Sequence, residues 1–111
     1  MKVTTLIPLH HNDGNGSKVS VKEMKSIRRR LWSRFEGITR EGRTHGEWTD
    51  PKDGKRYSDV CDKVVIETDR RRLAEITELI KEIGRSLGQK AMYMEVQYYD
   101  GVQFLRTDEE E

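Results

Sequence analysis

The chain has 111 residues, 33% hydrophobic and 37% charged, and its 21 basic and 20 acidic side chains leave a net charge of +1. This length predicts one domain, and so small a charge does not oppose collapse. The near-zero net charge argues against a dedicated DNA-binding or membrane-surface protein, which would be strongly basic. No apolar stretch approaches the roughly 20 residues of a membrane span, and the first residues lack a signal-peptide pattern. We therefore expect a cytoplasmic protein with neither DNA nor a membrane as partner.

The first third of the chain predicts a strand followed by a helix. Alternating apolar residues indicate a strand at Lys2–His10. Ser20 and Glu23 have the spacing of a capping box, which starts a helix. The apolar residues that follow recur at three- and four-residue steps, as in a helix with one buried stripe. They are Val21, Met24, Ile27, Leu31 and Phe35. Gly37 is expected to mark the C-terminal end of this helix.

The middle of the chain predicts a β-hairpin. Ile38–Trp48 is expected to form a strand, and regular alternation would place Ile38 and Trp48 on the same face. The segment Asp50–Lys55 (D-P-K-D-G-K) contains the D-G pair that is typical of hairpin turns. Tyr57–Glu67 then predicts the partner strand, centred on the run K-V-V-I-E.

The last third predicts a helix and a final strand. Asp69 caps the helix, whose apolar stripe runs from Leu73 to Leu87 before Gly88 ends it. Ala91–Tyr98 is expected to form the last strand with Tyr98 inward. A short hairpin partner could follow at Val102–Leu105.

The predicted order is β-α-β-β-α-β, the ferredoxin-like plan of the α+β class. It combines a four-stranded antiparallel sheet with two helices, which can cover only one face of the sheet. We expect a single domain over residues 1–106 and a disordered acidic tail over residues 107–111. Proteins of this architecture are commonly homodimers, so a homodimer is expected by analogy of fold.

Three short landmarks point to a known family. They are G-E-W at Gly46–Trp48, D-K-V-V-I-E at Asp62–Glu67 and L-G-Q-K-A-M at Leu87–Met92. They resemble a family of small bacterial proteins known only as a domain of unknown function, whose members carry G-x-W, K-V-V and G-Q-x-A in the same order. The resemblance spans about residues 38–104. It implies a ferredoxin-like fold and brings no activity with it.

One candidate site follows from the topology. The first and second strands of this fold run parallel, so the loops after them share one edge of the sheet. The residues expected at this rim are His10, His11, His45, Glu47, Trp48 and Tyr57. No H-x-x-x-H or C-x-x-C spacing fixes two ligands on one element, so we predict no metal. His45 and Glu47 share a strand face, which suits either acid–base chemistry or an exposed ion pair.

The two tryptophans raise separate questions. Alternation along the strand favours Trp48 as a cap on the core, with a stacking surface for a base or sugar as the alternative. Trp32 follows Leu31 on the flank of the first helix and is expected to be partly buried.

A second candidate site lies at the start of the second helix. Arg70, Arg71 and Arg72 occupy its first turn, where the helix dipole favours negative charge. The three guanidinium groups and the free amides of the turn could bind an anion or a phosphorylated ligand. The simpler interpretation is that Asp69 caps the turn and that Arg71 pairs with Glu75.

The sequence thus favours a non-enzymatic module that binds a partner or a small anionic ligand such as a nucleotide, without a cofactor. The alternative is a small enzyme that uses the histidine-bearing rim. An RNA-binding sheet is disfavoured because the third strand lacks a set of aromatic residues for base stacking.

Overall fold

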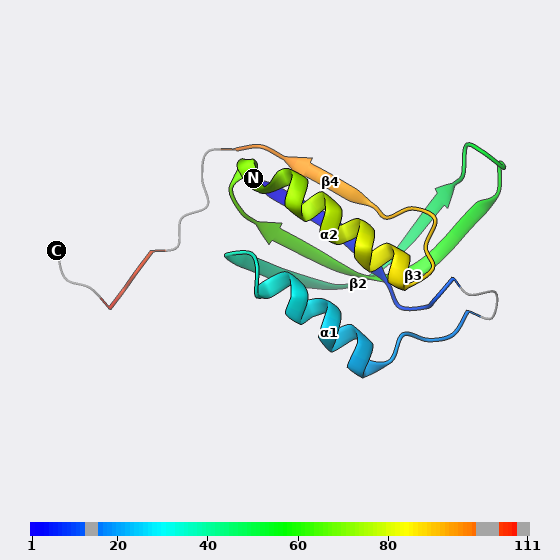
Figure 1. The fold of residues 1–111 in the computed structure, drawn as a ribbon, viewed down its shortest axis with the longest axis horizontal. Coiled ribbons are helices and arrows are strands. Elements are labelled where there is room, and N and C mark those ends of the chain that lie inside the picture. The colour runs from blue at the N-terminus through cyan, green and yellow to red at the C-terminus, as the bar shows by residue number, and fades with distance from the viewer. Residues whose placement is uncertain (13–15, 100–104, 109–111) are drawn as a thin grey trace.

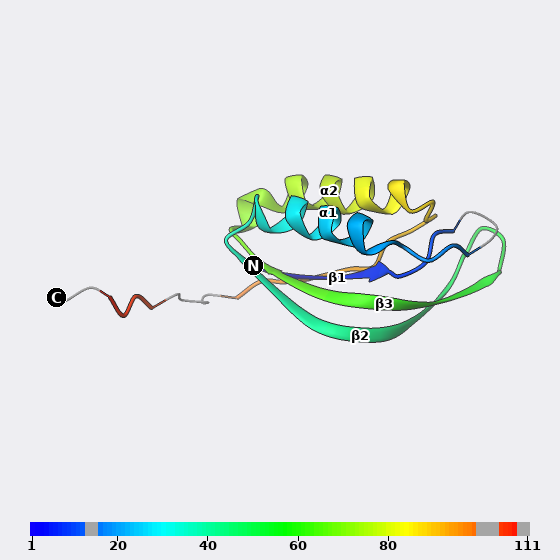
Figure 2. The ribbon, with the colours of Figure 1, turned by 90° about the horizontal axis from the view of Figure 1, so that it is seen from below.

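The computed structural model describes residues 1–12, 16–99 and 105–108. Its elements, in chain order, are β1 (Lys2–Pro8), α1 (Val21–Trp32), β2 (Gly37–Thr49), β3 (Arg56–Glu67), a 3₁₀ turn (Arg70–Arg72), α2 (Leu73–Ser86) and β4 (Met94–Gln97). The strands form one sheet in the order β2-β3-β1-β4, with every neighbouring pair antiparallel. The two helices lie side by side (Figure 1) and cover one face of the sheet (Figure 2). The predicted ferredoxin-like fold is confirmed.

The core fills the space between the two helices and the sheet. Helix α1 contributes Met24, Ile27 and Leu31, which are all buried because their spacing puts them on one side of the helix. Its facing partners in the core come from β1, β3, α2 and the residue that follows α2: Val3, Ile7, Val64, Ile66, Ile76, Leu79, Ile80, Ile83 and Leu87. The predicted capping box is present, with the Ser20 hydroxyl accepting from the Glu23 amide and the Glu23 carboxylate accepting from the Ser20 amide.

The ends of several elements differ from the sequence prediction. Helix α1 ends at Trp32 rather than near Gly37, because the amides of Arg34 and Phe35 both donate to the Leu31 carbonyl and tighten the last turn. Gly37 instead begins β2. Phe35 is buried as predicted, but it lies beyond the helix.

Strand β4 is also shorter than expected. It begins at Met94, three residues after Ala91, and pairs with β1 only at Lys2–Thr5. Tyr98 lies beyond its end and is 53% exposed, so the inward position predicted for this side chain is wrong. The hairpin strand predicted at Val102–Leu105 falls mainly on residues outside the described ranges, as do the last three residues of the predicted tail.

An irregularity in the β2–β3 pairing decides which side chains face the helices. The register shifts between Arg40 and Gly42, so Glu41 is an extra residue in β2, and Gly42 has a positive φ of 90°. Such a bulge reverses the alternation of the strand beyond it. Ile38 pairs with the core residue Ile66, whereas Trp48 pairs with Tyr57 on the opposite side of the sheet. The prediction that Ile38 and Trp48 share a face is therefore wrong.

None of the helices in the described part of the chain has the length and apolar character that crossing a membrane requires.

Candidate functional site

A pocket opens where β4 leaves the edge of β1. Because β4 pairs with β1 only as far as Thr5, residues 89–93 cross the end of the sheet as an irregular segment. Within it, the Tyr93 carbonyl accepts a hydrogen bond from the Thr5 hydroxyl. Between this segment and the β2–β3 hairpin lies a cavity of about 340 Å³, which we call the hairpin pocket. It is lined by Leu6, Pro8, Gly46, Glu47, Trp48, Tyr57, Asp59, Cys61, Gln89, Ala91, Met92, Tyr93 and Met94.

Two aromatic rings form one wall of the hairpin pocket. Trp48 and Tyr57 are paired across the hairpin, with ring centroids 5.9 Å apart and ring planes 30° from parallel. Trp48 is 40% exposed, so it does not cap the core, contrary to the expectation from simple alternation. The bulge at Glu41 is the reason, because it turns Trp48 to the side of the sheet away from the helices.

Lys90 ties the 89–93 segment to the hairpin. Its ammonium group donates to the Tyr57 hydroxyl (2.9 Å) and to Asp53 Oδ2 (3.4 Å), and it lies 5.2 Å from the centre of the Tyr57 ring. The hydrogen bonds to Tyr57 and Asp53 raise the pKa of Lys90. These contacts fix the position of Tyr57 at the pocket and connect the 89–93 segment to the hairpin, which is far from it in sequence.

Two of the ionisable groups that line the pocket, Asp59 and Cys61, have raised pKa values. Burial raises the pKa of the Asp59 carboxyl, and the charges of His10 and His45 act in the opposite direction. Burial, together with the Asp59 carboxylate, raises the pKa of the Cys61 thiol to about 11. Because a thiolate is the reactive form, Cys61 is a protonated wall residue at neutral pH rather than a nucleophile.

The histidines predicted at the rim have different polar partners. His11 Nε2 lies 2.8 Å from Glu23 at the start of α1. His45 Nε2 lies 2.6 Å from the Ser58 hydroxyl and 4.0 Å from Glu47 Oε1.

The other rim residues divide between the hairpin pocket and its surroundings. Trp48 and Tyr57 pack together in the pocket, and His10 acts on Asp59 through its charge. The Glu47 carboxylate accepts from Arg56 (2.9 Å), and this bond lowers the pKa of Glu47. Within the described residues no group of three His, Cys, Asp or Glu side chains is arranged to hold a metal ion.

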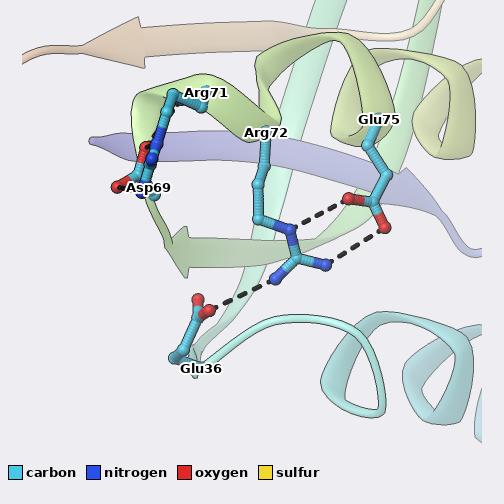
Figure 3. A network of polar contacts seen from close by, with 5 residues as sticks. All are labelled: Glu36, Asp69, Arg71, Arg72 and Glu75. Atoms are coloured by element: carbon cyan, nitrogen blue, oxygen red, sulfur yellow. Dashed lines mark hydrogen bonds and ion pairs between the residues drawn. The ribbon is translucent and has the colours of Figure 1, made fainter.

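The three arginines before α2 have partners within the fold, and Figure 3 shows those of Arg71 and Arg72. Arg71 binds both carboxylate oxygens of Asp69, at 3.0 and 3.1 Å, and Asp69 also accepts from the Arg71 amide. Arg72 binds both oxygens of Glu75, at 2.9 and 3.1 Å. Arg71 therefore pairs with Asp69, and it is Arg72 that takes the partner predicted for Arg71.

Arg72 also links α2 to the loop after α1. Its third nitrogen donates to Glu36 Oε1 (3.2 Å), and its guanidinium lies 4.5 Å from the centre of the Phe35 ring. Arg70 is placed over the Tyr98 ring at 5.2 Å. These contacts explain how three cations are held at the start of a helix without a ligand. An anion at this turn would have to compete with three carboxylates, and the anion site stays a prediction.

Sequence reasoning did not identify Asp59, Gln89 or Met92 as pocket residues. For Asp59 a signal existed, because Tyr57, Asp59 and Cys61 alternate along one strand and so share a face. For Gln89 and Met92 none existed, because their position depends on where β4 begins to pair.

Comparison with known proteins gives a fold and no assigned family. No family model matches the chain, and no curated protein matches it, which is consistent with the resemblance to a domain of unknown function. Among solved structures the chain is similar to a phage SAM lyase in complex with S-methyl-5'-thioadenosine. The TM-score is 0.59 at 14% sequence identity, and the match covers 86% of this chain and 78% of the other. At this level of identity the similarity is one of fold.

Proposed function

We propose that the hairpin pocket binds a small molecule made of a flat aromatic ring, a sugar and an apolar substituent, of the adenosine-thioether type. The observation that carries this proposal is the combination of a partly exposed aromatic pair, a carboxylate and an apolar wall in one cavity of about 340 Å³. That volume lies at the lower end of the range for small-molecule sites, about 300–1,000 Å³.

The lining suits each part of such a ligand. The free face of Trp48 offers a surface on which a base can stack. Asp59 can accept hydrogen bonds from sugar hydroxyls. Leu6, Met92 and Met94 offer apolar and polarisable contacts for a thioether group.

The similarity of fold supports the choice of ligand class. The phage SAM lyase was determined with S-methyl-5'-thioadenosine bound, and that molecule has a base, a sugar and a thioether. It is therefore the first compound to test on this chain.

Binding can be measured by isothermal titration calorimetry with S-methyl-5'-thioadenosine and with adenosine. We expect saturable binding of the thioether and weaker binding of adenosine, which lacks the apolar substituent. Tyr57→Ala and Trp48→Ala should each weaken binding about tenfold or more, because stacking contributes about 1–3 kcal/mol per base. Tyr98→Ala is the matched control, since Tyr98 lines no part of the hairpin pocket, and it should bind as the unmodified chain does. Equal affinity in all three variants would contradict the proposal.

A second candidate function is an enzyme that uses the same pocket. Asp59 favours it, because a carboxyl whose pKa is raised by burial is suited to take up a proton during a reaction. In the reaction to test, water displaces the sulfur of SAM from the four-carbon amino-acid chain and gives its proton to Asp59, which leaves S-methyl-5'-thioadenosine and homoserine. The test is incubation with SAM, followed by chromatography for both products. An enzyme should release both products and lose most turnover in Asp59→Asn, with ligand binding retained. If the chain only binds its ligand, no product should form at any protein concentration tried.

A further inference from the structure

The charge of the chain is divided unevenly along its length. Residues 18–40 contain eight Lys or Arg and two Glu, a net charge of +6, so the rest of the chain carries −5. The near-neutral total, from which a DNA partner was not expected, therefore conceals one strongly basic segment. Such a separation of charge is typical of proteins that bind polyanions. In the fold this segment comprises α1 and the first residues of β2.

Helix α1 presents most of this charge to solvent. It carries Lys22, Lys25, Arg28, Arg29 and Arg30 against a single acid, Glu23, which is occupied by the capping box and by His11. Arg30 pairs with Glu82 of α2. Within the described residues the side chains of Lys22, Lys25, Arg28 and Arg29 make no hydrogen bond or ion pair. Lys22, Lys25 and Arg29 recur at helical spacing and lie along one side of α1.

A small apolar pocket adjoins the same helix at its C-terminal end. It has a volume of about 310 Å³ and is lined by Arg28, Leu31, Trp32, Ile38, Arg40 and Val64. Trp32 is 65% exposed, so the partial burial expected from its sequence position is wrong. Arg40 is held in place by Asp62, which accepts from two of its nitrogens at 3.3 and 3.1 Å. An exposed indole thus stands beside two guanidinium groups over an apolar floor.

We propose that α1 and the Trp32 pocket form a binding surface for single-stranded nucleic acid. One base stacks on Trp32 in the pocket. The phosphates that follow it contact Arg29, Lys25 and Lys22 in turn, toward the N-terminal end of α1. Proteins that bind single strands combine these two features, a basic track for the backbone and an aromatic side chain for a base. The proposal is independent of the function assigned to the hairpin pocket.

Other occupants fit the surface less well. A second copy of α1 would bring cations against cations, which is repulsive. A lipid surface would require the apolar side of α1 to insert, but Met24, Ile27 and Leu31 are at most 7% exposed in the core. An acidic protein partner would satisfy the cations without using the stacking face of Trp32.

The experiment is fluorescence anisotropy with labelled 12-nucleotide RNA and DNA single strands, each at several salt concentrations. We expect binding that weakens with salt, with a logarithmic slope near −2, because three phosphate contacts each contribute about −0.7. The RNA and DNA arms decide which strand is preferred. Duplex DNA of the same length should bind more weakly, since its bases cannot reach Trp32.

Two variants with a matched control test the location. Lys25→Ala with Arg29→Ala should reduce the salt slope by about 1.4, because two contacts are lost. Lys81→Ala with Arg85→Ala removes the same two residue types at the same spacing from α2 and should leave binding unchanged. Trp32→Ala should weaken binding about tenfold, with its circular dichroism unchanged because this side chain is exposed.

Three results would overturn the proposal: no binding of either strand in 50 mM salt, equal losses in the two double variants, or no effect of Trp32→Ala. Binding of poly-glutamate, or of vesicles rich in phosphatidylserine, as tight as that of the oligonucleotides would identify an acidic protein or a membrane as the partner instead.

Discussion

Asp69 shows how one carboxylate can make a basic turn possible. It accepts from the Arg71 side chain and from the Arg71 amide, and these hydrogen bonds lower its pKa to about 2. The carboxylate therefore serves as a cap and as the counter-charge of a neighbouring arginine at the same time. Arg72 acts at longer range, since Glu36 and Phe35 come from a different part of the chain.

The Asp69 interaction predicts a specific dependence of stability on pH. Because the pKa is lower in the folded chain than in the unfolded chain, its contribution is fully present above pH 4 and is lost as the pH falls toward 2. Asp69→Asn should be less stable than the unmodified chain at pH 6, and the difference should shrink between pH 4 and pH 2. Urea denaturation of both chains at a series of pH values measures this difference in the free energy of unfolding. A constant difference over this range would show that the carboxylate charge is not responsible.

Gly88 supports a second prediction at this scale. It ends α2 with φ of +67°, and a Cβ at this position would lie 2.6 Å from the Asn12 carbonyl oxygen. Gly88→Ala combines a left-handed backbone with a clash against main chain, and we expect a loss of about 2–4 kcal/mol in the free energy of unfolding.

Gly54→Ala is the matched control for that substitution. Gly54 has φ of +71° with nothing within 4 Å of its Cβ position, so only the backbone contribution of about 1 kcal/mol should remain. Urea denaturation of both variants separates the two effects. Equal losses of unfolding free energy in the two variants would mean that the contact with the Asn12 carbonyl does not contribute to the effect of Gly88→Ala.

At the scale of elements, α2 and the segment before β4 control the hairpin pocket together. Gly84 lies on the buried side of α2, and a Cβ there would be 2.5 Å from Met92 Cγ and 3.2 Å from its sulfur. Met92 in turn lines the hairpin pocket. Because residue 84 has no side chain, residues 89–93 can approach α2 closely. The hairpin pocket, on the other side of this segment, therefore stays open.

Gly84→Ala tests this connection. The substitution gains about 1 kcal/mol of helix propensity but forces Met92 to move, which costs about 1–3 kcal/mol when a packed site is overfilled. We expect a net loss of stability and a weaker affinity for S-methyl-5'-thioadenosine. Glu78→Ala, on the exposed side of α2, is the control and should alter neither quantity. A variant that is more stable and binds normally would show that Met92 relocates without affecting the pocket.

For the whole molecule, the helices cover one side of the sheet, and no described element covers the other (Figure 2). On the uncovered side, Trp48 of β2 and Tyr93 of the segment before β4 are both more than a third exposed. The homodimer expected from the architecture stays a prediction. Sedimentation equilibrium at micromolar concentration should give twice the chain mass of 13.0 kDa. A single-chain mass at every concentration would contradict it.

The local chemistry of the sequence determined the elements and their order. The Ser20–Glu23 capping box, the apolar stripes of both helices and the D-G turn of the hairpin each depend on neighbours within a few residues, so they could be predicted. The order of the strands followed from the same elements and the rules of chain connection. Trp48 and Tyr57 could be predicted to lie close together because a hairpin joins their strands.

What the sequence could not determine depends on pairing between distant segments. The extra residue Glu41 turns Trp48 from the core to the open side, and the late start of β4 creates the hairpin pocket. Arg72 finds Glu36 across the fold, and Trp32 is exposed because the core of α1 is already filled by three other side chains. In each case several arrangements have similar local energies. Long-range packing and strand register select one of them, and these exist only in the folded chain.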